Sequence, residues 1–160
     1  MVEHIDDISD PDLRLLHSYW LSKRGSRRMP RRAEIDPVDI PTLLPLVFLV
    51  DVRQGPLRFR FRLIGTAICA RWGSDATWKY LDQLDLDGER EVVLRQYAAV
   101  VETGKPRFDL EEITTDDGRY VRYERLLLPL SEDDATPNIL LGGQHGVGVE
   151  GFQIHGHRWL

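Results

Sequence analysis

The sequence contains a single cysteine, Cys69, among its 160 residues. One cysteine excludes an internal disulfide framework and is typical of a protein from a reducing compartment. No apolar stretch approaches the roughly 20 residues of a membrane-spanning helix. The first ten residues are rich in acidic side chains and lack the apolar core of a signal peptide. These absences predict a cytoplasmic protein that does not associate with a membrane.

Catalytic and metal-binding motifs are also missing. The sequence has no nucleophile elbow, no phosphate-binding P-loop and no zinc-protease motif. Its five histidines are scattered, and the pair His155 and His157 falls short of the ligands that a metal site needs. The net charge of −5 lacks the basic surplus typical of nucleic-acid binding. We therefore predict a protein that is not an enzyme, holds no metal and binds no nucleic acid.

The composition supports one folded domain with an extension. Hydrophobic residues make up 42% of the chain and aromatic residues 9%, which is enough for a packed core. We expect five regions along the chain: a disordered segment at 1–9, an amphipathic helix at 10–25, a basic, proline-rich linker at 26–44, the core domain at 45–146 and a glycine-rich tail at 147–160.

The amphipathic helix has clear signals at both ends. Asp10 is a good N-cap, Pro11 suits the first helical position, and Gly25 suits the position after the last turn. Apolar and aromatic residues recur along one face at helical spacing. We expect this face to contact a second subunit or another partner, through Leu13, Leu16, His17 and Trp20.

The segment 23–32 is strongly basic, with six lysines and arginines and no acid. One interpretation is a patch that binds phosphate or an acidic partner. The other is a solvated connector whose arginines pair with the acidic body of the protein. Both remain open from the sequence.

Residues 57–63 alternate strictly between apolar side chains and arginines. The alternation predicts a strand with one buried face. The opposite face, with Arg58, Arg60 and Arg62, is either a row that contacts a ligand or a charged edge that blocks association with other sheets. A short helix is expected to follow and to end at Gly73.

The remaining elements form a simple order. Residues 46–52 predict a buried strand that is joined to the arginine-bearing strand by a tight turn at 54–56. Residues 88–102 carry the apolar stripe of an amphipathic helix. Three further strands are predicted at 107–115, 119–130 and 138–144, and the glycines at 142–146 are interpreted as the exit from the sheet. Strands on both sides of helices predict an α+β fold with an antiparallel sheet.

This order resembles that of the PAS domains. The sequence is also similar to a single-domain PAS family found in alphaproteobacteria. The resemblance rests on Tyr19-Trp20, Asp36-Pro37, residues 43–45 (Leu-Leu-Pro) and residues 64–66 (Ile-Gly-Thr). One position departs from the family pattern, because Trp78 stands where such proteins tend to have glycine.

The resemblance implies a PAS fold: a five-stranded antiparallel sheet in the order 2-1-5-4-3, with short helices and one longer helix on one face. A small cavity would lie between the long helix and the sheet. The N-terminal helix would pack on the other face or against a second subunit. The arginine-bearing strand would lie at the edge of the sheet.

Residues that line such a pocket are expected on both of its walls, because ligand pockets are mostly apolar with a few polar groups. We expect either a pocket or a filled core at Phe61, Cys69, Trp72, Trp78, Leu81, Tyr97, Val101 and Tyr123. The surroundings of Cys69 are apolar and argue against a light-sensing flavin, and the long helix has no histidine to bind haem. No cofactor is therefore expected.

Two functions remain open. The first is a non-enzymatic PAS-type regulatory module that acts through homodimerisation and through contacts with an unknown signalling protein. The second is a small-molecule sensor with an apolar pocket between the long helix and the sheet, in which ligand binding and partner binding are coupled.

Overall fold

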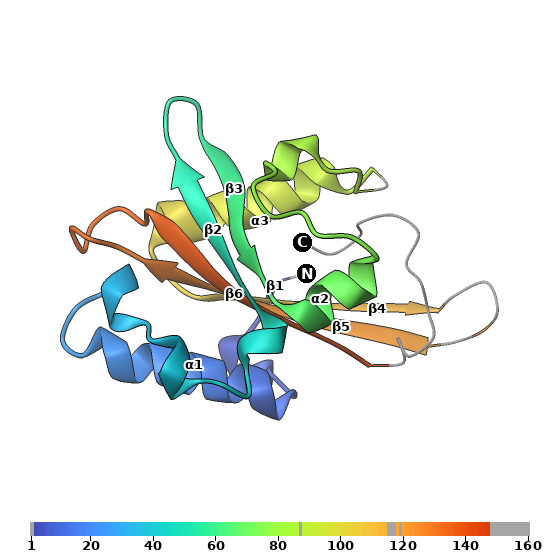
Figure 1. Cartoon of the computed structure of the whole chain (residues 1–160), viewed down its shortest axis with the longest axis horizontal. Helices are drawn as coiled ribbons and strands as arrows, with labels where there is room; N and C mark the ends of the chain where they lie inside the picture. The colour runs from blue at the N-terminus through green and yellow to red at the C-terminus, as the bar shows by residue number, and fades with distance from the viewer. Residues whose placement is uncertain (1, 87, 115–117, 119, 148–160) are drawn as a thin grey trace.

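The structure is a computed structural model that describes residues 2–86, 88–114, 118 and 120–147. A single sheet separates two helical layers (Figure 1). The elements in chain order are β1 (Val2–Glu3), η1 (Ile5–Asp7), α1 (Pro11–Arg24), η2 (Arg32–Glu34), η3 (Pro37–Asp39), η4 (Leu44–Leu46), β2 (Val47–Arg53), β3 (Arg58–Ile64), α2 (Thr66–Trp72), η5 (Leu81–Gln83), α3 (Arg90–Thr103), β4 (Arg107–Thr114), β5 (Tyr120–Leu130) and β6 (Ile139–Val147).

The sheet has six antiparallel strands in the order β1-β4-β5-β6-β2-β3. Without the two-residue strand β1, the order numbered from β2 is 2-1-5-4-3, as predicted. Strand β3, which carries the alternating arginines, lies at one edge of the sheet. The predicted α+β class and the predicted strand order of the antiparallel sheet are therefore confirmed.

We call the side of the sheet that faces α2 and α3 the inner face, and the side that faces α1 the outer face. Side chains alternate between the two along each strand. On the inner face, strand residues such as Phe48, Phe61 and Leu127 share a buried cluster with residues of α2 and α3. On the outer face, Leu49 and Leu126 share a second buried cluster with residues of α1.

Helix α1 is built as predicted but its apolar face is turned toward its own sheet. The carboxylate of Asp10 accepts a hydrogen bond from the Leu13 amide at 2.9 Å and caps the helix. Leu13, Leu16 and Trp20 are each 1% exposed. The Trp20 indole donates to the Pro129 carbonyl oxygen at 2.9 Å. The predicted contact of this face with a second subunit is wrong, because the outer face of the sheet already covers it.

His17, the fourth residue of that predicted interface, is half-buried beside Trp20, and the centroids of the two rings lie 6.4 Å apart. Burial lowers the pKa of its imidazole. A lowered pKa keeps this side chain neutral near pH 7, so that it extends the packed face of α1. Contact of His17 with a second subunit stays a prediction.

The N-terminal segment is ordered where the structure describes it, so the prediction of disorder over 1–9 is wrong for these residues. Strand β1 pairs with β4, and Ile8 is 1% exposed within the outer cluster. Two isoleucines, Ile5 and Ile8, among acidic residues are too few to show a periodicity. The burial of Ile8 depends on the outer face of a sheet that forms much later in the chain.

The basic linker is also anchored. Met29, Ile35, Ile40 and Leu43 are buried in the outer cluster. The Asp134 carboxylate accepts hydrogen bonds from the amides of residues 28 and 29 at 2.9 and 3.0 Å. The segment therefore packs across the outer face through its apolar side chains. Neither interpretation drawn from its charge predicted this packing.

Gly142 and Gly143 lie within strand β6, between β5 and β2, and not at the exit from the sheet as predicted. A Cβ atom on Gly142 would lie 2.0 Å from the Phe48 ring on the inner face. A Cβ on Gly143 would lie 2.6 Å from a methyl group of Leu16 on the outer face. Glycine is required at both positions because side chains from both faces approach the backbone closely.

A helix that crosses a membrane needs a long apolar stretch. None of the helices in the described part of the chain meets this requirement.

Candidate functional site

The structure brings most of the predicted pocket residues together on the inner face. Phe61, Trp72, Leu81 and Tyr97 belong to the inner cluster, and the partly buried Cys69 and Val101 pack against it. Tyr123, on the same face of β5, is 1% exposed.

The aromatic rings of the inner face contact one another edge to face. The centroids of Phe61 and Trp72 are 6.4 Å apart, and those of Phe59 and Tyr97 are 5.3 Å apart. Phe48 lies 6.0 Å from Phe61. Such pairs add stability beyond the area that they bury. These rings fill much of the space between the sheet and α2, which favours the interpretation of a filled core.

Trp78 lies on the surface and not among the residues of the inner cluster. Its side chain is 61% exposed, and the guanidinium of Arg60 lies 5.2 Å from its ring centroid. Its φ of 70° lies in the left-handed region that glycine adopts most easily. This backbone conformation explains in physical terms why glycine suits the position in similar sequences. The exposed side chain shows that the larger tryptophan is accommodated on the surface.

Three buried donors beneath or within α2 and α3 have no hydrogen-bond acceptor among the described residues. They are the Trp72 indole nitrogen, the Tyr97 hydroxyl and one terminal nitrogen of Arg71. Burial lowers the pKa of the Arg71 guanidinium and raises that of the Tyr97 phenol. Unpaired buried donors cost free energy. They are the polar groups of the inner face that are available to a ligand or to water.

Cys69 has the properties of an unreactive thiol. Burial, and secondly the neighbouring carboxylate of Asp75, raise its pKa. Its sulfur lies 3.8 Å from the Ile64 carbonyl oxygen. The thiolate is the reactive form, so a raised pKa lowers the reactivity of this side chain.

A buried charged cluster joins α3 to strands β4 and β5. The Asp109 carboxylate accepts bonds from Arg125 at 2.9 Å and from both ends of the Arg107 fork at 2.8 Å. Arg125 also donates to Gln96 of α3 at 2.6 Å. The side chains of Asp109 and Arg125 are 6% and 2% exposed. This cluster fixes the register of α3 on the sheet, because moving either element would leave a buried charge unpaired.

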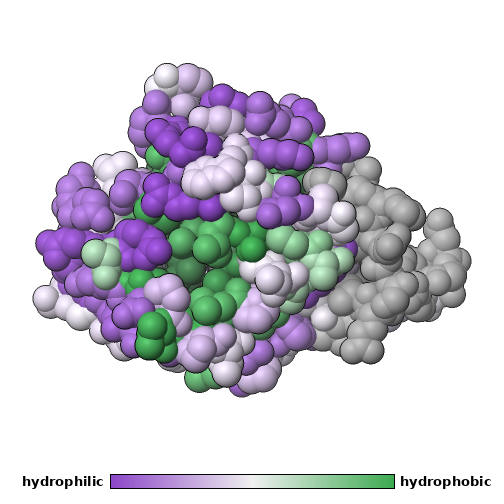
Figure 2. Space-filling model, viewed as in Figure 1, coloured by the Kyte–Doolittle hydropathy of each residue, from purple (hydrophilic) through white to green (hydrophobic). Residues whose placement is uncertain are grey.

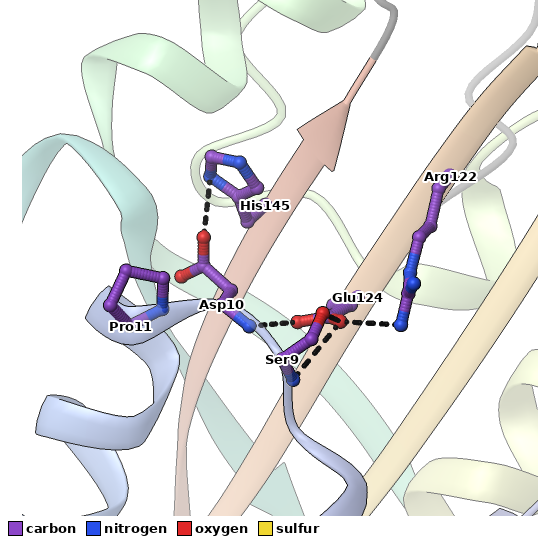
Figure 3. A pocket seen from close by; sticks show the side chains of 6 residues that line it. All are labelled: Ser9, Asp10, Pro11, Arg122, Glu124 and His145. Atoms are coloured by element: carbon purple, nitrogen blue, oxygen red, sulfur yellow. Dashed lines mark hydrogen bonds and ion pairs between the residues drawn. The ribbon is translucent and has the colours of Figure 1, made fainter.

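A second polar cluster lies on the outer face, around a cavity of about 180 Å³ at the start of α1 (Figure 3). Glu124 of β5 is buried there and accepts bonds from the Asp10 amide at 2.9 Å and from Arg122 at 3.0 Å. The amide and hydroxyl of Ser9 also donate to it. His145 of β6 lies 3.3 Å from the Asp10 carboxylate. These contacts fasten the N-terminal end of α1 to two strands of the sheet.

The arginines of β3 are paired within the chain. Arg60 and Arg62 lie 3.1 and 3.0 Å from the nearly buried carboxylate of Asp51. Arg58 forms a bidentate pair with Asp82 at 2.7 and 2.8 Å. The three arginines therefore form a charged edge of the sheet. They are paired with two carboxylates, so part of their positive charge remains uncompensated.

A family model described as a PAS domain matches residues 8–144, most of the chain. The chain belongs to the PAS domain family. PAS domains are sensory or regulatory modules, and no catalytic family is indicated for this one. No curated protein sequence matches the chain.

The chain is similar to several solved structures. A light-oxygen-voltage domain studied with a flavin analogue has a TM-score of 0.50 at 12% identity, over 69% of this chain and 82% of that one. The light-oxygen-voltage protein of Rhodobacter sphaeroides has a TM-score of 0.49 at 14% identity, over 71% and 69% of the two chains. A PAS domain of Colwellia psychrerythraea has 0.46 at 14%, over 71% and 98%. At 12% identity, the similarity to the first of these structures is one of fold alone.

Most of the charged residues in the two buried polar clusters of this PAS domain were not identified from the sequence. Arg107 and Asp109 alternate with apolar residues, which signals a strand with one polar face but not a buried one. Glu124 and Arg125 lie in the middle of a strand with no motif around them. Their partners come from Ser9, Asp10 and Gln96, far away in the sequence, and only the fold brings these groups together.

Proposed function

We propose that this PAS domain is a non-catalytic regulatory module that acts through homodimerisation and through contacts with a signalling protein. The observation that carries the proposal is an apolar, hollowed area on the surface between the β2–β3 hairpin and α1 (Figure 2). Exposed apolar side chains of the protein include Val38, Leu44 and Leu63, which are 81%, 36% and 46% exposed. Contiguous exposed apolar areas commonly mark sites of protein contact.

Analytical ultracentrifugation of the purified chain tests this function. A concentration-dependent equilibrium between monomer and dimer is expected. A monomer at every concentration would remove homodimerisation from the proposal.

A small-molecule sensor is the second candidate. The three unpaired donors of the inner face, on Arg71, Trp72 and Tyr97, favour it, since a ligand with acceptor groups would satisfy them. Native mass spectrometry of the purified protein tests this candidate. A co-purifying mass that is lost in Tyr97→Phe would support it. A bare polypeptide mass, with no thermal stabilisation by any small acid in a screened set, would refute it.

Flavin and haem do not fit the residues of the inner face. Phe48, Phe61 and Trp72 occupy its centre, and the raised pKa of Cys69 opposes the formation of a reactive thiolate. The sequence of α3 contains no histidine to ligate haem iron. Absorbance spectra of the purified protein are expected to show no flavin or haem band. A visible band of either cofactor would contradict this part of the proposal.

Within the PAS family, we propose that the chain is one of the single-domain proteins of alphaproteobacteria and that it works in the cytoplasm. The similarity of Tyr19-Trp20, Asp36-Pro37 and residues 43–45 supports this placement. Two of these motifs have structural roles, since the Tyr19 hydroxyl lies within hydrogen-bond distance of the Asp39 carboxylate and accepts a bond from the Asp36 amide.

A further inference from the structure

Helix α1 leaves part of the outer face uncovered. It packs on strands β5 and β6, whereas β2 and β3 lie beyond it. A shift in register between Leu49 and Val50 places Leu63 of β3 opposite Leu49 of β2. Leu49 is buried, but Leu63 is 46% exposed. The uncovered area therefore includes an exposed leucine side chain, and Figure 2 shows an apolar hollow between the β2–β3 hairpin and α1.

One rim of this area is basic. Arg53, Arg60 and Arg62 surround Asp51, and the nearest nitrogen–oxygen distances are 3.9, 3.1 and 3.0 Å. Three positive charges face one carboxylate, so the rim retains a positive surplus. Arg53 and Arg62 are 51% and 44% exposed and line an open cavity of about 260 Å³.

The opposite rim is acidic. Residues 33–46 contain Glu34, Asp36 and Asp39 and no lysine or arginine. Asp36 and Asp39 are exposed, and Asp39 is already bound to Lys23 at 2.9 Å. Ile40 and Leu43 of this segment share the outer cluster with Leu49, which places the acidic rim on the same face as the hollow.

We infer that this face is an isologous interface between two copies of the chain. An isologous contact brings the same patch of both subunits together across a two-fold axis. With the axis through the apolar hollow, the basic rim of each copy meets the acidic rim of the other. Leu44 and Leu63 pack around the axis, and Arg62 of one copy pairs with Asp36 of the second copy. The inference rests on the proposed homodimerisation and assigns it a surface.

Charge reversal on the full-length chain tests the pairing. Arg62→Glu and Asp36→Arg are each expected to weaken dimerisation by about tenfold in analytical ultracentrifugation, because each reversal breaks the two symmetry-related charge pairs at once. The double variant is expected to dimerise like the wild type, because it restores both contacts with the charges exchanged. Leu63→Asp, at the centre, is expected to weaken dimerisation more than either single reversal.

Val92→Asp is the matched control, since Val92 is 40% exposed on α3, in the layer on the other side of the sheet. Circular dichroism confirms that each variant folds. Unchanged dimerisation in Leu63→Asp, with a dimeric wild type, would overturn the assigned surface and leave homodimerisation intact. A monomeric wild type would overturn both. A double variant no better than the single ones would overturn the pairing of Arg62 with Asp36.

Discussion

The two faces of the sheet are built differently. The inner face is filled by aromatic rings, and three of the buried donors near it lack a partner among the described residues. The outer face is covered by α1 and the linker over β5 and β6, and the buried carboxylate of Glu124 beneath the start of α1 accepts several hydrogen bonds. Beyond α1 the same face is open and apolar. The inner face thus retains buried donors without a partner among the described residues, whereas the outer face retains an exposed apolar surface.

The largest loss of stability is expected from a substitution that removes the packing of α1 on the outer face. Trp20→Ala should lower the free energy of unfolding by about 3–5 kcal/mol, because it opens a cavity and leaves the Pro129 carbonyl without its donor. Urea denaturation measures the change. Leu21→Ala, at a position 39% exposed on the same helix, is the control and should change the value by less than about 0.5 kcal/mol. Equal losses in the two variants would contradict the burial of α1.

The two glycines of β6 compare the faces directly. Gly142→Ala should destabilise by about 3 kcal/mol, because the new methyl meets the rigid Phe48 ring at 2.0 Å. Gly143→Ala should cost about half as much, since it meets the flexible methyl ends of Leu13 and Leu16 at 2.8 and 2.6 Å. Thermal or urea unfolding gives both values. The reverse ranking would show that the outer layer is the more rigid of the two.

Removing the charge of Glu124 tests how the N-terminal end of α1 is held. Glu124→Gln should cost about 2 kcal/mol, because it loses the charge-assisted bonds to Arg122 and to the Asp10 amide. Faster hydrogen exchange should appear at the Asp10 amide before the rest of the protein opens. Glu132→Gln, on an exposed loop, is the control. Unaltered exchange in Glu124→Gln would mean that apolar contacts alone hold this segment.

The smallest change in stability is expected from a substitution on the inner face. Tyr97→Phe removes a buried hydroxyl that has no acceptor among the described residues, so stability should change by less than about 0.5 kcal/mol or increase slightly. Urea denaturation of the purified protein again measures it. A loss above about 1 kcal/mol would show that a ligand or an ordered water occupies the inner face, which would favour the sensor.

The sequence predicted local features well. The caps of α1 and the stripe of α3 depend on neighbouring residues, and the structure contains both. The alternation in β3 holds at Phe59 and Phe61 but is wrong at Leu63, which the shift in register against β2 leaves 46% exposed.

The partner of an apolar face depends on the whole fold. Leu16 and Trp20 have the same spacing whether they face a second subunit or the chain's own sheet. The roles of Glu124 and Gly143 depend on their contacts with α1, and no local pattern in the sequence predicts those contacts.

The glycine pair has a consequence for communication across the domain. The contact of Gly142 with Phe48 and the contact of Gly143 with Leu13 and Leu16 are separated by one peptide bond. The aromatic interior and the N-terminal helix therefore touch the backbone of the same strand at adjacent residues. One peptide bond of β6 thus joins a residue packed under the Phe48 ring to a residue packed under α1, and no loop lies between them.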